Sequence, residues 1–410
     1  MAELDEKREW RLVVFMFLNF ALVLSGYVFL SYILRLPVGR LAKLGLLAFA
    51  FLSAGQLMIF RYFFGGLGGI EASRWLLLVT SFLQGLIFFL FLLSLVRDLG
   101  WLLSFAVGKG IGKSVRVWLN GGTAALVMLV LAFGLDLVGM IGAAKVPEVK
   151  RSEVVITDWP EGLDGLRVAV LADMHISRFF DRDWVTSVVE RTMAEKPDLI
   201  LLPGDMVDGR AELRAPDVAP LADLGAPYGI WACAGNHEYI SQIREWLPVF
   251  EQLGIHLLYN AHQVILPRGI PVIVAGLADP TAMGSRYNMP GPDLHLALEG
   301  APEGLPVILM DHRPGRALEN VNDPRVSFQL SGHTHGGMMP ILSLMVKRAN
   351  GGFLRGFYDL GDLKLFVHPG VGLWAGFPIR LLNPSEITIL TIKAPGPLAM
   401  GESLANGRKS

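Results

Sequence analysis

The first 145 residues of this 410-residue chain are dominated by long stretches that carry no charged side chain. A helix that crosses a bilayer needs about 20 mostly apolar residues, within a range of about 17–25. We therefore expect residues 1–145 to form a membrane region with about four transmembrane helices. The expected helices cover residues 12–34, 44–60, 75–96 and 117–143. The second stretch lies at the short end of the range.

The composition also indicates that part of the chain lies in lipid. Only 18% of the residues are charged, whereas soluble proteins carry about 25% charged residues. The net charge of -1 gives no electrostatic reason to expect a nucleic-acid partner. The single cysteine, Cys233, excludes an internal disulfide framework and a cysteine-rich zinc site. Because Cys233 lies in an apolar run, we expect a buried strand residue rather than a reactive thiol.

The lysine and arginine content of the short loops bears on the orientation in the membrane. Four helices would place the N-terminus and the C-terminal region on the same side. Loops 35–43 and 97–116 carry three and four basic residues, whereas loop 61–74 carries two. Cytoplasmic loops are enriched in Lys and Arg, so the C-terminal region is favoured on the extracytoplasmic side of the cell membrane. A fifth helix near residues 99–107 would reverse this orientation.

Asp136 is the one charged residue in the last apolar stretch. It could belong to a polar path through the membrane, or it could lie near a helix end and reach the lipid headgroups. The apolar stretches offer no second acid or base that would pair with it. We therefore favour the contact with headgroups.

From about residue 150 onward, short apolar runs alternate with helical patterns, which is typical of an α/β domain. The runs that predict strands are residues 166–172, 199–202, 230–234, 272–275, 307–310, 326–330, 363–367 and 387–392. Residues 184–194 and 241–253 have the apolar spacing of amphipathic helices. We expect one α/β domain over residues 150–393. Residues 394–410 are rich in Gly, Pro, Ser and Asn, which predicts a flexible tail.

Acids and imidazoles follow the first two of these predicted strands. Asp173 and His175 come directly after one strand, and Asp205 and Asp208 follow Gly204 at the end of the next. Carboxylates and neutral imidazoles bind borderline divalent metal ions, and glycine lets the backbone turn closely beside an ion. Asp205 is well placed to bridge two metal ions, whereas we expect Asp208 to support the loop.

The same residue types follow three later strands. Asn236 and His237 follow one strand, His312 follows another, and His333 and His335 occupy alternate positions in a glycine-flanked motif. Asn236 offers a neutral carbonyl oxygen, and His237 could face a leaving group or a phosphate oxygen. A lone histidine is more often a surface or core residue than a ligand. The joint pattern instead favours a metal centre, because open α/β sheets place ligands at the carboxyl ends of their strands.

Together these motifs resemble the calcineurin-like metallophosphoesterases over roughly residues 150–393. The segments Gly235–Tyr239, Ser331–Gly337 and Pro378–Thr388 are similar to the bacterial membrane-anchored branch of that family. The resemblance implies a four-layer α-β-β-α sandwich behind the helical membrane region. It also implies the metal-dependent hydrolysis of phosphoric esters.

The resemblance further implies two divalent metal ions, and ligand type alone does not choose among Mn, Fe and Zn. One ion would be held by Asp173, His175, Asp205 and His335. The other would be held by Asp205, Asn236, His312 and His333. Asp205 would then bridge the two ions. His237 would be the catalytic residue, acting as general acid or stabilising charge on the phosphoryl group.

Two positions depart from the pattern of that family. Asp311 stands where members often have a small residue, and Met338 stands where they often have Gln. Neither is an expected ligand, so the departures bear on specificity more than on activity. Arg178, Arg313 and Arg380 are candidates for contacts with phosphate, because Arg offers a bidentate geometry. For each one alone, an exposed or structural arginine is the simpler interpretation.

The leading hypothesis is a membrane-anchored phosphoesterase that uses metal-activated water. Its phosphorylated substrate could be a lipid phosphate, a nucleotide-linked lipid or an envelope polymer, cleaved at a phosphate ester or pyrophosphate bond. The sequence identifies no substrate-binding residue. The alternative is a non-catalytic metal-binding membrane sensor or scaffold, and the complete ligand set argues against it. A transporter is disfavoured because the apolar stretches lack paired charges.

Overall fold

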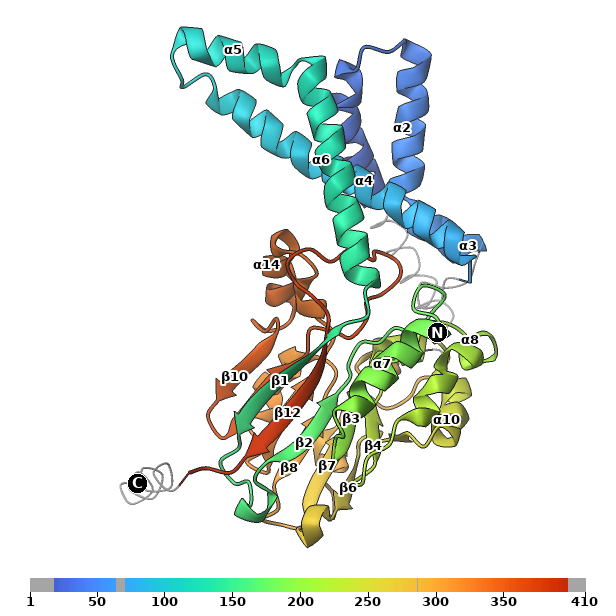
Figure 1. Ribbon diagram of the computed structural model, residues 1–410, viewed down its shortest axis with the longest axis vertical. Coiled ribbons are helices and arrows are strands. Elements are labelled where there is room, and N and C mark those ends of the chain that lie inside the picture. The colour runs from blue at the N-terminus through green and yellow to red at the C-terminus, as the bar shows by residue number, and fades with distance from the viewer. Residues whose placement is uncertain (1–17, 64–70, 286, 397–410) are drawn as a thin grey trace. The chain divides into compact units, whose positions relative to one another are not determined.

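The computed structural model of the protein describes residues 18–63, 71–285 and 287–396 (Figure 1). The chain divides into two compact units. The helical unit comprises Met1–Gly142 together with Ala375–Leu381, and the α/β unit comprises Ala143–Trp374 together with Leu382–Ser410. Residues 397–410 of the expected tail and residues 12–17 of the first expected helix lie outside the described residues.

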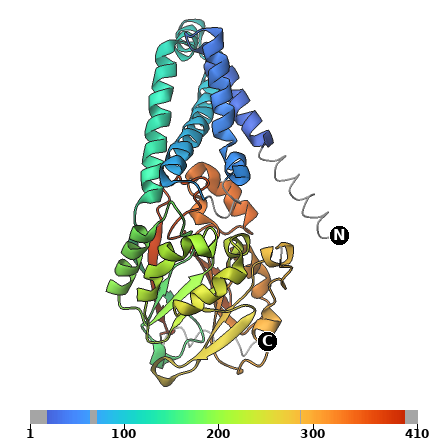
Figure 2. The ribbon, with the colours of Figure 1, turned by 90° about the vertical axis from the view of Figure 1, so that its right-hand side faces the viewer.

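Three helices in the described part of the helical unit are long and apolar enough to cross a membrane. They are the helix Leu18–Arg35, α4 (Arg74–Leu103) and α6 (Gly122–Ala144), and Figure 2 shows α6 as one unbroken helix. Between α4 and α6 lies the shorter helix α5 (Lys109–Leu119). Because α4 continues to Leu103, the segment near residues 99–107 does not form a further crossing of its own.

The helix expected over residues 44–60 is not continuous. It is replaced by α2 (Arg40–Ala54) and α3 (Gln56–Phe63), which are separated at Gly55. At 1.5 Å per residue α2 is about 22 Å long, which is shorter than the ~30 Å hydrocarbon core of a bilayer. Glycine is among the weakest helix formers, which accounts for the break at this position. Among the described residues the structure therefore shows three candidate spanning helices and not clearly four.

The environment of Asp136 also differs from the expectation. Asp136 lies well inside α6 and is fully buried against Gly85 of α4, where an added Cβ would collide with its carboxylate. Neither carboxylate oxygen has a hydrogen-bond partner among the described residues. The side chain thus faces the neighbouring helix and does not reach out to the headgroups.

Two six-stranded sheets form the α/β unit (Figure 1). The strand order in the first sheet is β1 (Glu148–Val155), β12 (Glu386–Lys393), β2 (Leu166–Val170), β3 (Leu199–Pro203), β4 (Ile230–Cys233) and β5 (His256–Leu257). The order in the second is β10 (Gly356–Leu360), β11 (Leu363–Val367), β9 (Val326–Ser331), β8 (Val307–Met310), β7 (Val272–Gly276) and β6 (Ala261–Ile265). β2, β3 and β4 are parallel to one another, as are β7, β8 and β9.

The main core lies between the two sheets. Leu201 of β3, Met310 of β8 and Leu330 of β9 belong to one buried apolar cluster that joins both sheets. A second cluster packs α12 (Leu294–Ala297) and α13 (Ala317–Asn320) onto the other face of the second sheet. The remaining helices are α7 (Arg182–Ala194), α8 (Ala211–Val218), α9 (Asn236–Ile240), α10 (Ile243–Gln252), α11 (Thr281–Gly284) and α14 (Pro340–Ala349). The unit is thus an α/β fold with two packed sheets.

The strands without an apolar run in the sequence are the edge strands of the two sheets. β1 and β5 end the first sheet, and β6 and β10 end the second. Their side chains are mostly exposed or half-buried, because an edge strand has a neighbour on one side only and carries polar residues that discourage further pairing. Each of the eight predicted apolar runs coincides with one of the eight inner strands.

Candidate metal centre

The residues expected to bind metal are brought together by loops that follow β2, β3 and β4 of the first sheet and β8 and β9 of the second. The loops after β2 and β3 run side by side, because the N–H of Asp173 donates to Gly204 O and the N–H of His175 donates to Asp205 O, each at 3.0 Å. In the second sheet the N–H of Gly332 donates to His312 O at 3.0 Å. The carboxyl ends of these strands thus present their side chains to one place.

Two further hydrogen bonds close this arrangement, one between the two sheets and one within the first sheet. The backbone N–H of His333, after β9, donates to Asp173 Oδ1 at 2.8 Å. The backbone N–H of His237, after β4, donates to Asp205 Oδ1 at the same distance. Each aspartate therefore has one oxygen held by the backbone and a second oxygen left for another partner.

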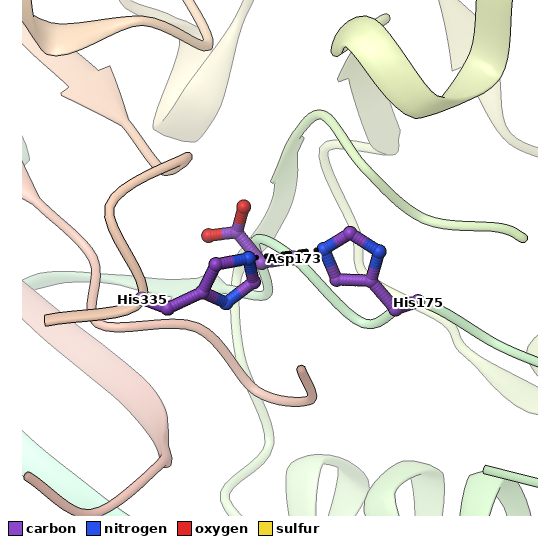
Figure 3. A group of neighbouring side chains, drawn as sticks. All are labelled: Asp173, His175 and His335. Atoms are coloured by element: carbon purple, nitrogen blue, oxygen red, sulfur yellow. Dashed lines mark hydrogen bonds between the residues drawn. The ribbon is translucent and has the colours of Figure 1, made fainter. Parts of the chain in front are cut away.

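One group of potential ligands consists of Asp173, His175 and His335 (Figure 3). The Nε2 atoms of His175 and His335 lie 3.2 Å apart, and Figure 3 shows both rings beside the Asp173 carboxylate. Asp173 Oδ2 is buried and has no hydrogen-bond partner among the described residues. Two imidazole nitrogens and an unpaired carboxylate oxygen that converge in this way are suited to a divalent cation.

A second group consists of Asp205, His312 and His333. His312 Nδ1 lies 2.9 Å from Pro203 O, and a carbonyl oxygen only accepts, so Nδ1 carries a proton and Nε2 is left to face Asp205 Oδ2 at 3.1 Å. Burial lowers the pKa of His312, but the carboxylates of Asp205 and Asp173 outweigh it and raise that pKa to about 10. The position therefore favours positive charge strongly.

Asp205 Oδ2 stands between the two groups. Besides His312 Nε2, it lies 3.6 Å from His175 Nε2 of the first group. The remaining expected ligand, Asn236, is half-buried at the start of α9, and its Oδ1 is a buried acceptor with no partner among the described residues. Its neighbour His237 is bound to Asp205 through the backbone. The donor set thus fits metal ions on both sides of Asp205.

His237 contacts a carboxylate whose function the sequence did not reveal. Asp208 Oδ1 lies 2.5 Å from His237 Nδ1, which leaves Nε2 as the available ring nitrogen. Burial lowers the pKa of His237, but the carboxylates of Asp208 and Asp205 more than offset this and raise that pKa to about 9. The two carboxylates therefore favour the protonated form of His237. In the sequence the only signal is the spacing Gly204-Asp205-x-x-Asp208, which predicts support of the loop and not a contact with His237.

Glu238 is a second residue whose importance the sequence did not show. Its fully buried carboxylate accepts four backbone N–H groups, from Asp205 at 2.9 Å, Met206 at 2.6 Å, Val207 at 3.2 Å and Gly235 at 2.7 Å. It thereby ties the loop after β3 to the loop after β4. The available signal was an acid directly after the Asn-His pair.

The backbone around the expected ligands is unusual. Five of the seven expected ligands have a positive φ, a region that non-glycine residues rarely adopt. They are Asp173, His175, Asp205, His333 and His335, with φ between 48° and 71°. Such strain persists only where surrounding structure imposes it, and it clusters at functional sites. Glycines allow the close packing, because a Cβ on Gly332 would lie 2.5 Å from Asp173 Oδ2.

The three arginines considered as phosphate contacts have different surroundings. Arg313 donates to both oxygens of buried Asp279, at 2.7 and 3.0 Å, and to Thr281 Oγ1 at 2.8 Å. Arg380 is buried and groups with the helical unit. Arg178 is exposed in the loop after His175. The ion pair of Arg313 and the burial of Arg380 favour a structural interpretation of both.

The two departures from the family pattern lie beside the site. Asp311 is buried and accepts hydrogen bonds from Asn320 Nδ2 at 2.9 Å and Arg316 Nε at 3.2 Å. It therefore has partners of its own and supports the loop that carries His312. Met338 follows the loop that carries His335 and has a φ of 55°.

Comparison with known proteins bears directly on this centre. A family model described as calcineurin-like phosphoesterase matches residues 166–337. The chain is 30% identical over 332 residues to a zebrafish (Danio rerio) "Transmembrane protein with metallophosphoesterase domain", which covers 78% of this chain and 74% of that protein. It is 31% identical over 271 residues to an uncharacterized metallophosphoesterase of Campylobacter jejuni, covering 65% of this chain and 69% of the relative. This chain therefore belongs to the calcineurin-like phosphoesterases and is a metal-dependent phosphoesterase.

Proposed function

We propose that the protein is a membrane-anchored phosphoesterase with two divalent metal ions that hydrolyses a phosphate ester or pyrophosphate bond. The observation that carries the proposal is the position of Asp205 Oδ2, which lies 3.6 Å from His175 Nε2 and 3.1 Å from His312 Nε2. One oxygen thus faces imidazoles of both ligand groups, as a bridging ligand must. Asp173 Oδ2 and Asn236 Oδ1 are buried without a hydrogen-bond partner among the described residues, and a bound cation would satisfy both.

Each side chain has a defined place in this proposal. Asp173, His175 and His335 would hold one ion, Asn236, His312 and His333 would hold the other, and Asp205 would bind both. When bound, a pair of divalent ions supplies a water of lowered pKa and polarises the phosphoryl oxygens. The mixed carboxylate, amide and imidazole set is compatible with Mn, Fe or Zn.

His237 would protonate the leaving oxygen. The Asp208 carboxylate fixes its Nδ1, so the proton to be transferred resides on Nε2. A general acid of this kind contributes about 10²–10⁴-fold to a rate. After transfer, the neutral imidazole keeps its hydrogen bond to Asp208 and can be protonated again from solvent.

We place the α/β unit on the extracytoplasmic side of the cell membrane, behind a multi-pass anchor. α6 determines this side, because a connection before a spanning helix and a unit after it lie on opposite sides of the membrane. Lys109, Lys113 and Arg116 lie in the short connection before α6, and cytoplasmic connections are enriched in such residues. The substrate would then be a phosphorylated lipid or envelope component.

The test is hydrolysis of chromogenic phosphate monoesters and diesters by the purified full chain with added Mn²⁺. Asp205→Asn should lose about a hundredfold or more of kcat/KM. Replacing a residue that only hydrogen-bonds to a metal ligand already lowers activity by about 10–100-fold, and Asp205 is an expected ligand itself. The matched control is Asp223→Asn, an exposed aspartate, which should retain full activity. A folded, metal-loaded protein that cleaves neither these esters nor lipid phosphates would favour the sensor or scaffold.

A further inference from the structure

Helix α14 carries an exposed apolar row beside the candidate metal centre. None of its residues is buried, and Ile341, Leu344 and Met345 are 58%, 59% and 64% exposed. Positions three and four apart share one face of a helix, so the three side chains form one row. Arg348 continues this row after the apolar residues, and Lys347 lies next to it. Contiguous exposed apolar surface marks a contact site in a folded protein.

The helix is attached firmly to the loop that carries His335. Asn383 Nδ2 donates to Gly336 O at 2.8 Å and lies 3.2 Å from Ser343 Oγ of α14. A Cβ added to Gly337 would lie 2.7 Å from the same Ser343 Oγ, so loop and helix are in direct contact. Leu382, next to Asn383 in the chain, is 84% exposed. Whatever covers α14 therefore lies next to the metal centre.

Two observations identify the partner as a lipid bilayer with anionic headgroups. Only residues 145–147 separate the end of α6, a helix able to span a membrane, from the start of β1. Three residues extend to about 10 Å, so a spanning α6 would keep the start of β1 close to the membrane surface. The row itself combines large apolar side chains with Lys347 and Arg348 at one end, which is the composition of helices that bind anionic interfaces.

We propose that α14 inserts Ile341, Leu344 and Met345 into an anionic lipid surface and so presents lipid phosphate headgroups to the metal centre. Membrane insertion rests on the α14 surface and on the short link between α6 and β1, whereas the presentation of substrate rests on the proposed phosphoesterase function. The substrate class is then a phosphate or pyrophosphate ester carried by a membrane lipid.

Insertion is tested with a fluorescent probe in the full chain, reconstituted in nanodiscs that contain phosphatidylglycerol. Cys233 is the single cysteine and is fully buried, so Leu344→Cys can be labelled selectively with an environment-sensitive dye. The matched control is Leu266→Cys, because Leu266 is 61% exposed. It follows Ile265, the last residue of β6, which pairs with Val272 at the start of β7. That position is therefore remote from the metal-binding edge.

Nitroxide-labelled lipids should quench the dye at position 344 several-fold more than at position 266. Equal weak quenching at both positions would overturn insertion. A dye at position 344 that is shielded from water but not quenched by lipid would show that protein covers α14, and it would overturn the proposal equally.

Presentation of substrate is tested with the variant Ile341→Ser/Leu344→Ser/Met345→Ser. Hydrolysis of phosphatidic acid in nanodiscs should fall about tenfold, because interfacial affinity scales with the apolar area inserted, while turnover of a soluble chromogenic diester should not change. A control triple variant, Leu213→Ser/Leu266→Ser/Leu296→Ser, replaces exposed leucines elsewhere on the unit and should leave both reactions intact.

The outcomes separate the two proposals. Wild-type protein that cleaves the soluble diester but neither cleaves nor is inhibited by phosphatidic acid would overturn the presentation of lipid substrate. Strong quenching at position 344 without hydrolysis of any ester would leave insertion in place and count against the proposed function alone.

Discussion

The carboxylate of Asp208 lies 2.5 Å from Nδ1 of His237 and 3.2 Å from Nδ1 of His175. One buried acid thus orients an expected metal ligand and the proposed proton donor together. Both imidazoles are left with Nε2 free to act, in one case on a metal ion and in the other on the leaving group.

Replacing Asp208 should therefore damage turnover more than folding. In Asp208→Asn, a neutral amide holds protonated His237 less well, and we expect kcat to fall by about 10–100-fold. The measurement is kcat on a chromogenic ester for three variants, namely Asp208→Asn, His237→Ala and the double variant Asp208→Asn/His237→Ala. Since the two residues act as a unit, the double variant should lose little more than His237→Ala alone. Fully additive losses would contradict the coupling.

Gly332→Ala should release metal. The added Cβ would lie 2.5 Å from Asp173 Oδ2 and would push that carboxylate away from His175 and His335. We expect a loss of bound metal and of activity, measured by mass spectrometry of metal content and by ester hydrolysis. Gly284→Ala is the matched control, because its Cβ would meet nothing within 4 Å. Normal metal content in Gly332→Ala would refute this account of the glycine.

Glu238→Ala should destabilise the α/β unit. Four backbone N–H groups would lose their acceptor, and each buried donor left unsatisfied costs about 1–3 kcal/mol. We expect a clear drop in the temperature of unfolding, followed by tryptophan fluorescence. Glu212→Ala, at an exposed position, should unfold like the wild type. An unchanged transition in Glu238→Ala would show that other groups hold the loop.

Arg313 offers a choice between a structural and a substrate-binding role. Its paired contacts with buried Asp279 predict that Arg313→Ala lowers stability by about 1–3 kcal/mol, because the buried carboxylate loses its charged partner. Additional replacement of Asp279 by Ala should recover part of this loss. A variant that unfolds normally but has a strongly raised KM would instead make Arg313 a phosphate contact.

The inner strands could be predicted from the sequence, whereas the edge strands could not. A buried strand such as β3 requires an unbroken apolar run, and that run is visible in the sequence. β1 and β10 are mostly exposed, so their sequences resemble loops. Similarly, the hydrophobicity of residues 44–60 indicated a spanning helix, because hydrophobicity alone does not reveal the break at Gly55.

The expected metal ligands could be placed because they follow inner strands directly. What the sequence could not show is how their backbones turn. Asp173, Asp205 and His335 adopt left-handed conformations that only the assembled loops impose. The contacts of Asp208 and Glu238 were hidden for the same reason, because both are made across loops from separate strands.

The central claim is that Asp205 bridges two metal ions, and electron paramagnetic resonance of the Mn²⁺-loaded full chain tests it most directly. Two ions that share the Asp205 carboxylate are coupled, so we predict a multiline exchange-coupled spectrum that collapses in Asp205→Asn. A simple six-line spectrum from one isolated Mn²⁺ per chain, unchanged by Asp205→Asn, would contradict the account.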